Sequence, residues 1–338
     1  MGGDSVIRSD ASLYFLIFSL FLPILQMNFL AAGMLRCSGN MRIPSIAGVL
    51  MCILDVVFNF FLIFPSRELS VGGLTLSIPG AGLGVQGAAL GTGLAESVAA
   101  AITLWYLFTR SSGLKIKAWR KSPSLPTPPI VRNSIRISLP MGLEHVVICG
   151  AQIMTTVIVA PLGIPAIAAN SFAITAESLC YMPGYGIADA ATTLVGQSLG
   201  AGRRRLTRRF AYITVFMGMA VMGIMGVVMY IFAPQIIGTM TPVEEIRRLG
   251  VMALRIEAFA EPMFAAAIIS YGVFVGAANT LVPSLMNFFS IWAVRISLAA
   301  WLAPTMGLKG VWVAMCAELC FRGIIFLIRL RGKQWMKI

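Results

Sequence analysis

The chain has 338 residues, of which 58% are hydrophobic and only 12% are charged, and its mean hydropathy is +0.86. Soluble domains carry about 25% charged residues, so this composition excludes an ordinary soluble globular protein. The formal net charge of +13 does not indicate nucleic-acid binding, because most lysines and arginines stand in short loops between long apolar runs.

The apolar runs match the length of bilayer-crossing helices, which need about 20 mostly apolar residues. Only helices and closed barrels satisfy their backbone hydrogen bonds in lipid, so we predict an all-α polytopic membrane bundle. In chain order, the nine predicted spans are 13–35, 45–65, 85–109, 135–160, 165–195, 210–233, 249–276, 283–303 and 309–329.

Basic residues are divided unequally between the two sides of the predicted bundle. The loops after the first, third, fifth and ninth spans hold 18 of them, and the opposite side holds 5. Because cytoplasmic loops are enriched in lysine and arginine, this split predicts a cytoplasmic C-terminus. We expect an integral protein of a bacterial inner membrane.

Two motifs occur twice along the chain. Ser38–Ser45 resembles Ala277–Ser284 at an offset of 239, and Gly84–Gly87 resembles Gly307–Gly310 at an offset of 223. The difference of 16 predicts an insertion in the first copy, the loop around 66–81. The copies are six spans apart, which indicates a parallel repeat and therefore two six-helix halves.

The repeat divides the chain into three predicted parts. They are 1–109, a partial N-lobe of three helices; 110–134, a basic cytoplasmic linker rich in proline; and 135–338, a C-lobe of six helices. Only three helices precede the linker, whereas one half of the repeat should contain six. We therefore expect that about three N-terminal helices precede this sequence in the complete fold.

Eight of the 13 acidic residues fall within predicted spans, where a charge at a helix centre costs about 2.5–3.5 kcal/mol. Such residues are typical of a polar pathway inside the bundle. They are Asp55, Glu96, Glu144, Glu177, Asp189, Glu257, Glu261 and Glu318.

Depth distinguishes three of these acids. Asp55, Glu144 and Glu261 lie about nine to twelve residues into their spans, which at 1.5 Å per residue places them near the membrane midplane. Secondary transporters bind substrates and coupling ions at that depth. Asn59 follows Asp55 by one helical turn, so the two could hold Na⁺ or a proton together.

The other acids allow both a functional and a structural interpretation. Glu257 and Glu261 are four residues apart, and their mutual repulsion favours a proton on one of them. Ion pairing inside the bundle is the structural alternative for Glu257, with Arg255, and for Glu96 and Glu318. Arg295 and Arg322 are the candidate partners of Glu96 and Glu318. Glu177 is included among the candidate site residues, and His145 beside Glu144 is expected to be a hydrogen-bonded interior residue.

Motifs for other functions lack their structural context. Gly82–Gly87 fits GxGxxG but opens an apolar span, whereas a dinucleotide site needs a preceding strand. The Arg203–Arg209 cluster follows a span directly and is typical of an orientation signal. Because no ATP-binding loop, catalytic triad or metal-ligand cluster occurs, we expect no enzyme and no cofactor beyond a coupling ion, H⁺ or Na⁺.

The chain resembles the multidrug and toxic compound extrusion (MATE) transporters over essentially its whole length. The resemblance rests on Leu35–Asn40 with Pro44 and Ser45, on Gly84–Thr92, and most specifically on Pro183-Gly184 with Thr193–Gly202. It implies two six-helix lobes around a cavity and export of amphipathic or cationic drug-like compounds in exchange for H⁺ or Na⁺. Nucleotides and nucleic acids are not expected partners.

The match to the family's site residues is displaced at three positions. The family's fifth-helix Asn and Asp stand here in the order Asp55, Asn59, and its seventh- and tenth-helix acids fall about a turn after Glu144 and slightly after Glu261. Two alternative functions are a lipid-linked saccharide flippase of related fold and a non-transporting truncated remnant. Acids outnumber bases eight to three within the spans, which favours export of cations over binding of anionic headgroups.

Overall fold

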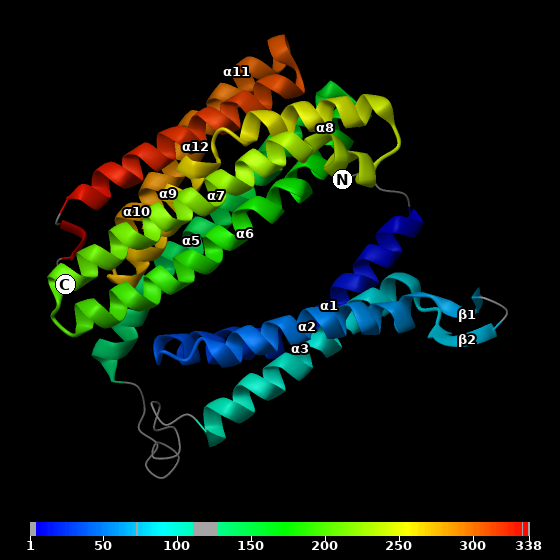
Figure 1. The fold of residues 1–338 in the computed structure, drawn as a ribbon, viewed down its shortest axis with the longest axis horizontal. Helices are drawn as coiled ribbons and strands as arrows, with labels where there is room; N and C mark the ends of the chain where they lie inside the picture. The colour runs from blue at the N-terminus through cyan, green and yellow to red at the C-terminus, as the bar shows by residue number, and fades with distance from the viewer. Residues whose placement is uncertain (1–4, 72–73, 111–126, 333, 337–338) are drawn as a thin grey trace. The chain divides into compact units, whose positions relative to one another are not determined.

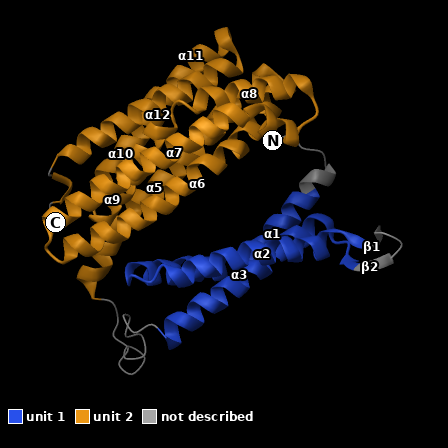
Figure 2. Cartoon of the chain, viewed as in Figure 1, with its two compact units in different colours: residues 1–125 blue, residues 126–338 orange. Residues whose placement is uncertain are grey.

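Helices make up most of the computed structural model, which describes residues 5–71, 74–110, 127–332 and 334–336. The chain divides into two compact units, residues 1–125 and 126–338 (Figure 1, Figure 2). Residues 111–126 of the predicted linker lie outside the described residues. The last part of that linker is helical, because a helix begins at Pro128, where a proline in the first turn needs no amide donor.

Unit 1 consists of three helices and a hairpin: α1 (Ser5–Cys37), α2 (Arg42–Ile63), β1 (Pro65–Val71), β2 (Leu74–Ala81) and α3 (Gly84–Thr109). Helix α3 packs against both α1 and α2. The predicted loop around 66–81 is instead a two-stranded antiparallel hairpin with an irregular register between Pro65 and Arg67. Two glycines between the strand sequences are one of the patterns that favour such a hairpin.

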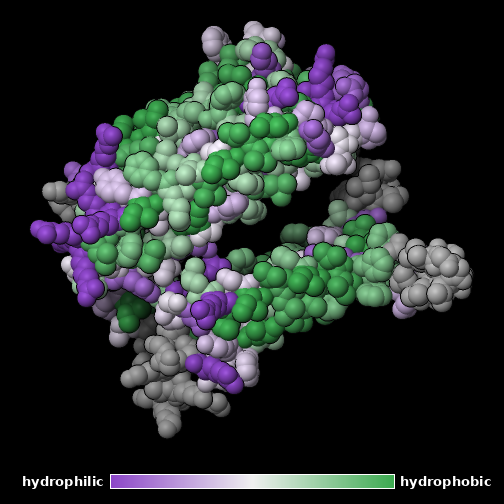
Figure 3. Space-filling view, in the orientation of Figure 1, coloured by the Kyte–Doolittle hydropathy of each residue, from purple (hydrophilic) through white to green (hydrophobic). Residues whose placement is uncertain are grey.

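Unit 2 holds the remaining helices. They are α5 (Pro128–Val159), η1 (Ala160–Leu162), α6 (Ile164–Gly200), α7 (Arg204–Met240), α8 (Glu244–Glu257), α9 (Glu261–Gly276), α10 (Leu281–Phe289), η2 (Ser290–Ile296), α11 (Ser297–Met306), α12 (Leu308–Arg331) and η3 (Gln334–Met336). Hydrophobic side chains cover the middle of this unit, and hydrophilic ones gather at its two ends (Figure 3).

The helices reproduce the nine predicted spans. Within the described residues, seven helical stretches are long and apolar enough to cross a membrane, and the α8–α9 pair adds an eighth if it counts as one span. Helix α6 is the ninth. It does not meet that standard, and it carries Glu177 and Asp189 and packs against α7, α8 and α9.

Two predicted spans are not continuous α-helices. The span 249–276 is broken between Glu257 and Glu261, where α8 and α9 meet at a bend of 60°. Pro262, in the first turn of α9, explains the break, because a proline has no amide hydrogen to donate to a preceding helical turn. The span 283–303 contains a π-helical segment, η2, and this wider turn often marks functional sites.

The two repeat copies share the same backbone turn. Gly39 and Ala278, which are 239 residues apart, both have positive φ, at 88° and 55°. In each copy the backbone N–H of the next residue, Asn40 or Asn279, donates a hydrogen bond to the carbonyl oxygen five residues earlier, at 2.9 Å. This is the hydrogen bond that closes a Schellman motif. The sequence repeat is thus also a structural repeat.

Small residues allow α6 and α9 to approach closely. A side chain at Gly272 would bring its Cβ to 2.6 Å from the backbone oxygen of Ala188. Thr192 also donates a hydrogen bond to the Gly272 carbonyl oxygen at 2.8 Å. Glycine at such crossings is typical of membrane bundles, which associate by close backbone packing. The crossing holds the acids of α6 near those that flank the α8–α9 break.

Candidate cation and substrate site

Glu144 lies near the middle of α5, and 7% of its surface is exposed. Its Oε2 accepts hydrogen bonds from the hydroxyls of Tyr271 and Ser284, both at 2.6 Å. Its Oε1 accepts one from Asn287 Nδ2 at 2.5 Å. Three neutral donors from α9 and α10 thus satisfy both oxygens of one buried carboxylate.

A cavity of about 230 Å³ opens beside this carboxylate. Glu144, His145, Asp189 and Tyr271 are among its lining residues. His145 is exposed on the surface of the chain at this cavity, and no side-chain hydrogen bond of the described residues involves it, so its expected interior role stays a prediction. The cavity therefore brings two acids from different helices, α5 and α6, to one space with the only histidine of the chain.

A second cavity, of about 370 Å³, adjoins the first. Tyr185, Phe264 and Arg322 line both cavities. Glu177 and Arg295 line the second one, together with polar groups from α5 and α6. Glu177 is 4% exposed. Unit 2 thus contains two adjoining cavities that have acidic and basic lining residues and share Phe264.

The acids at the α8–α9 break are the most enclosed. Glu257 is 0% exposed and Glu261 1%, and all four carboxylate oxygens lack a hydrogen-bond partner. The sequence placed both on one continuous helix face, which is wrong because the helix breaks between them. Arg255 does not pair with Glu257: its guanidinium lies over the Tyr230 ring, 5.3 Å from the centroid.

Glu318 forms an ion pair inside the bundle, which was its structural interpretation. It is 0% exposed and forms an ion pair with Arg322 at 3.1 Å, and it accepts a hydrogen bond from Ser290 at 2.5 Å. The Arg322 guanidinium also faces Phe264, 5.5 Å from the ring centroid. Pairing within the bundle, one turn apart on α12, is therefore confirmed for this acid.

The interior of unit 2 has more acidic than basic groups. Glu257 lies within electrostatic reach of Glu177, Glu261 and Glu318, Arg295 acts on Glu177 and Glu257, and Arg322 acts on Glu177 and Glu318. Arg295 contacts the sulfur of Met315. These acids outnumber the arginines four to two, so a bound cation or a proton would stabilise an acid that has no basic partner.

Unit 1 contains its own polar residues. Asn59 donates a hydrogen bond to Asp55 Oδ1 at 3.2 Å along α2, and the buried Oδ1 of Asn59 has no partner. The two side chains therefore contact each other along α2 as the spacing predicts, and the amide oxygen of Asn59 has no hydrogen-bond partner. A Cβ at Gly91 of α3 would meet that oxygen at 2.3 Å, so α3 encloses the pair closely.

Glu96 is held by an uncharged residue. Its Oε2 accepts a hydrogen bond from Asn28 at 3.1 Å, and Thr103 donates to Asn28 Oδ1 at 2.8 Å. The donor that binds Glu96 within its own unit is therefore neutral, and pairing with Arg295 or Arg322 of unit 2 stays a prediction. Asn28 and Thr103 could not be predicted as partners from the sequence, because uncharged polar residues are common in apolar spans.

Sequence reasoning also missed three partners of Glu144. Tyr271, Ser284 and Asn287 carry no charge, and the nearest of them lies 127 residues along the chain. Ser284 belongs to the repeated motif, which offered the one available signal. Of the described residues, no group of three or more His, Cys, Asp or Glu is arranged to hold a metal ion.

Comparisons with known proteins agree on one family. A model of the MatE family matches residues 140–301, the range that contains Glu144 and its three partners. The "Probable multidrug resistance protein NorM" of Thermotoga maritima is 26% identical over 316 residues, which cover 90% of this chain and 63% of that protein. The chain is therefore similar to MATE family proteins in sequence and in fold.

Other relatives and solved structures of MATE proteins agree. The protein of the same name from Idiomarina loihiensis is 26% identical over 253 residues, 71% of this chain and 54% of that one. A MATE structure in complex with MaL6 covers 98% of this chain at a TM-score of 0.85 and 20% identity, with 71% of its own chain covered. The structure of the Vibrio cholerae MATE transporter VcmN in its bent form covers 98% of this chain at a TM-score of 0.78 and 18% identity. The match covers 71% of the VcmN chain.

The likeness to solved MATE structures establishes the fold. The chain spans 63% of the length of the Thermotoga relative and 54% of the Idiomarina one. MATE proteins are transporters rather than enzymes, and the several apolar helices here are those of an integral membrane protein. The MATE comparisons do not favour the flippase alternative.

Proposed function

We propose that this chain acts in secondary active export of small amphipathic or cationic drug-like compounds, coupled to H⁺ or Na⁺ moving the other way. The observation that supports this most directly is Glu144, a buried carboxylate held by three neutral donors at the edge of a cavity. Ionisable residues buried in membrane helices commonly mark transport pathways.

The chemistry of the cavities suits amphipathic cations. Tyr185 and Phe264 present aromatic surface to both cavities, and Tyr181 lines the second. Aromatic faces attract cations, and Phe264 already faces a guanidinium. Carboxylates at Glu144 and Glu177 supply the opposite charge. An apolar compound with a cationic group would find both kinds of contact in unit 2.

Coupling requires a site whose occupancy changes the conformation. Glu257 and Glu261 flank a helix break and have no hydrogen-bond partner, so a proton or Na⁺ would supply the missing contact. Broken membrane helices commonly carry the ion sites of secondary transporters. Asp55 and Asn59 offer a second candidate ion site in unit 1, made of carboxylate and amide oxygens.

The experiment uses the purified chain in liposomes that contain ethidium, a fluorescent cationic dye. An imposed H⁺ or Na⁺ gradient should drive dye transport, and Glu144→Gln, Glu261→Gln and Asp55→Asn should each slow it by about tenfold, as expected for one lost charge-assisted contact. Glu245→Gln is the matched control, because that exposed acid lies outside both cavities.

Each outcome distinguishes the hypotheses. Wild-type transport rates in all three variants would exclude the assigned acids. Absence of gradient-driven dye movement in the unmodified chain would favour the non-transporting alternative. A response to only one of the two gradients identifies the coupling ion.

A further inference from the structure

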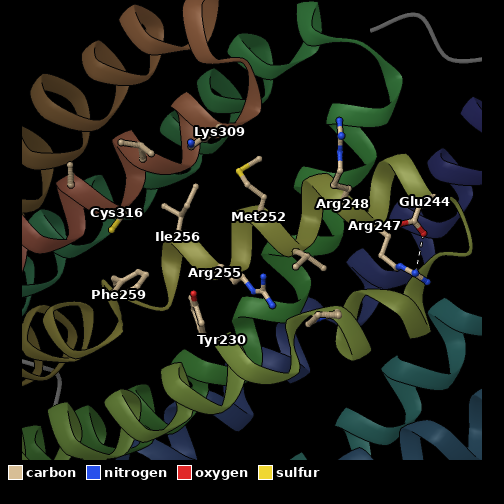
Figure 4. Close-up of a pocket in the computed structure, with 14 residues that line it drawn as sticks. Tyr230, Glu244, Arg247, Arg248, Met252, Arg255, Ile256, Phe259, Lys309 and Cys316 are labelled. Atoms are coloured by element: carbon tan, nitrogen blue, oxygen red, sulfur yellow. Dashed lines mark ion pairs between the residues drawn. The ribbon is translucent and has the colours of Figure 1, made fainter.

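A separate groove lies on the outside of unit 2, between α7, α8 and α12 (Figure 4). Its volume is about 840 Å³, larger than either interior cavity. None of the residues that line it lines the other two cavities. The buried face of α8, with Ala253, Leu254 and Glu257, points into the bundle, so the groove is formed by the other face of that helix.

The floor of the groove is apolar. It includes Met252 and Ile256 of α8, Val313 and Cys316 of α12, and Phe259 at the helix break, whose side chain is 71% exposed. An exposed aromatic ring beside aliphatic groups is a surface that lipid chains cover well. Figure 4 shows Phe259 and Cys316 near Ile256, at the opposite end of α8 from Glu244 and Arg248.

Basic side chains gather on the same groove. Arg247 and Arg248 stand near the start of α8, Lys309 at the start of α12, and Arg255 lies two helical turns after Arg248. Glu244 is the single acid of the groove and pairs with Arg247 at 3.0 Å.

The remaining three cations have no carboxylate partner among the described residues. The printed contact of Arg255 is the Tyr230 ring, at 5.3 Å. The groove therefore has an excess of positive charge above an apolar floor.

The order of these groups follows the expected depth in a bilayer. Helices α8 and α12 both begin at the end of unit 2 where α7 ends, so Arg248 and Lys309 lie near a helix terminus and hence at the membrane surface. Ile256, Phe259 and Cys316 follow two to three turns deeper. Charge at the surface and apolar contact below it is the polarity of a phospholipid.

We propose that this groove binds an anionic phospholipid. Arg248 and Lys309 contact the phosphate and the acidic headgroup, Arg255 extends the basic strip inward, and an acyl chain lies along Met252, Ile256 and Phe259. A free anion would leave the apolar floor uncovered, and a zwitterionic lipid would leave the excess positive charge unbalanced. The inference requires only that unit 2 spans a membrane, and it holds whether or not the chain transports drugs.

The experiment cross-links lipid to the purified full chain in mixed micelles. The probe is phosphatidylglycerol with a diazirine in its acyl chain, and the comparison probe is phosphatidylcholine with the same chain. Peptide mapping should place the phosphatidylglycerol adducts within 248–259 and 309–317. Arg248→Gln with Lys309→Gln should lower the apparent affinity at these peptides about tenfold, because each surface cation contributes to attraction of anionic lipid.

The matched control is Arg205→Gln with Arg209→Gln, which removes two exposed arginines at the opposite end of the unit. It should leave adducts in the groove unchanged. Equal labelling by phosphatidylcholine, or labelling that survives loss of Arg248 and Lys309, would overturn the proposal. Displacement of the lipid probe by excess inorganic phosphate would show a simple anion site and would overturn it as well.

Discussion

At the scale of single residues, the buried carboxylates of unit 2 differ in what surrounds them. Glu144 is held by neutral hydroxyl and amide donors, and Glu318 is held by an arginine and a serine. Glu257 and Glu261 have no donors. Because an unpartnered buried charge is the costliest of these states, the last pair has the most to gain from a bound cation.

The Glu318–Arg322 pair leads to a stability prediction. Glu318→Leu should destabilise the protein by about 3–5 kcal/mol, because it leaves the Arg322 guanidinium buried without its partner. The double variant Glu318→Leu with Arg322→Met should recover most of that loss, since neither charge remains. Thermal unfolding midpoints in detergent measure both effects. Equal destabilisation by the single and double variants would mean that the pair contributes only through packing.

At the scale of elements, the α8–α9 break and the α6–α9 crossing act together. The break places Glu257 at the end of one helix and Glu261 at the start of the next, within the same bundle interior. The crossing at Gly272 holds α9 against α6, which carries Glu177. The break and the crossing together set where the acids of α6, α8 and α9 lie in the interior of unit 2.

The close contact at Gly272 predicts intolerance to any side chain. Gly272→Ala should destabilise the protein by about 1–3 kcal/mol, because the added Cβ would lie 2.6 Å from the Ala188 oxygen. Gly186→Ala on α6 is the matched control: its Cβ meets nothing within 4 Å, and alanine favours helix. Thermal midpoints of the two variants should shift in opposite directions. A Gly272→Ala protein as stable as the control would show that α6 and α9 can separate freely.

At the scale of the whole molecule, the basic residues of unit 2 gather at the ends of its helices. The Arg203–Arg209 cluster and the end of α12, with Arg329 and Arg331, lie at one end of unit 2, and α8 and α12 begin at the other. Loops of a membrane protein that carry most of the lysine and arginine stay in the cytoplasm. We therefore predict that the C-terminus lies in the cytoplasm and that the proposed lipid groove lies in the opposite leaflet.

Reporter fusions test this orientation. Green fluorescent protein fused after Ile338 should fluoresce, and alkaline phosphatase fused at the same point should be inactive, because the first folds in the cytoplasm and the second outside it. Alkaline phosphatase fused after Pro242, in the α7–α8 connection, should be active. The reverse activities at the two fusion points would invert the assigned topology.

The sequence by itself determined the class of protein, the number of helical spans, the parallel repeat and the set of acids within the spans. These follow from local properties: the length of apolar runs, the charge of loops and the identity of residues at a fixed offset. The Schellman turns at Gly39 and Ala278 agree with the repeat because its motif is itself local.

Only the tertiary structure decided which acid meets which partner. Tyr271, Ser284 and Asn287 reach Glu144 from helices more than 120 residues away along the chain. The neutral donor of Glu96 and the basic groove beside α8 likewise depend on side chains from separate helices. Hydropathy and spacing describe one helix at a time, whereas a site is made where several helices pack.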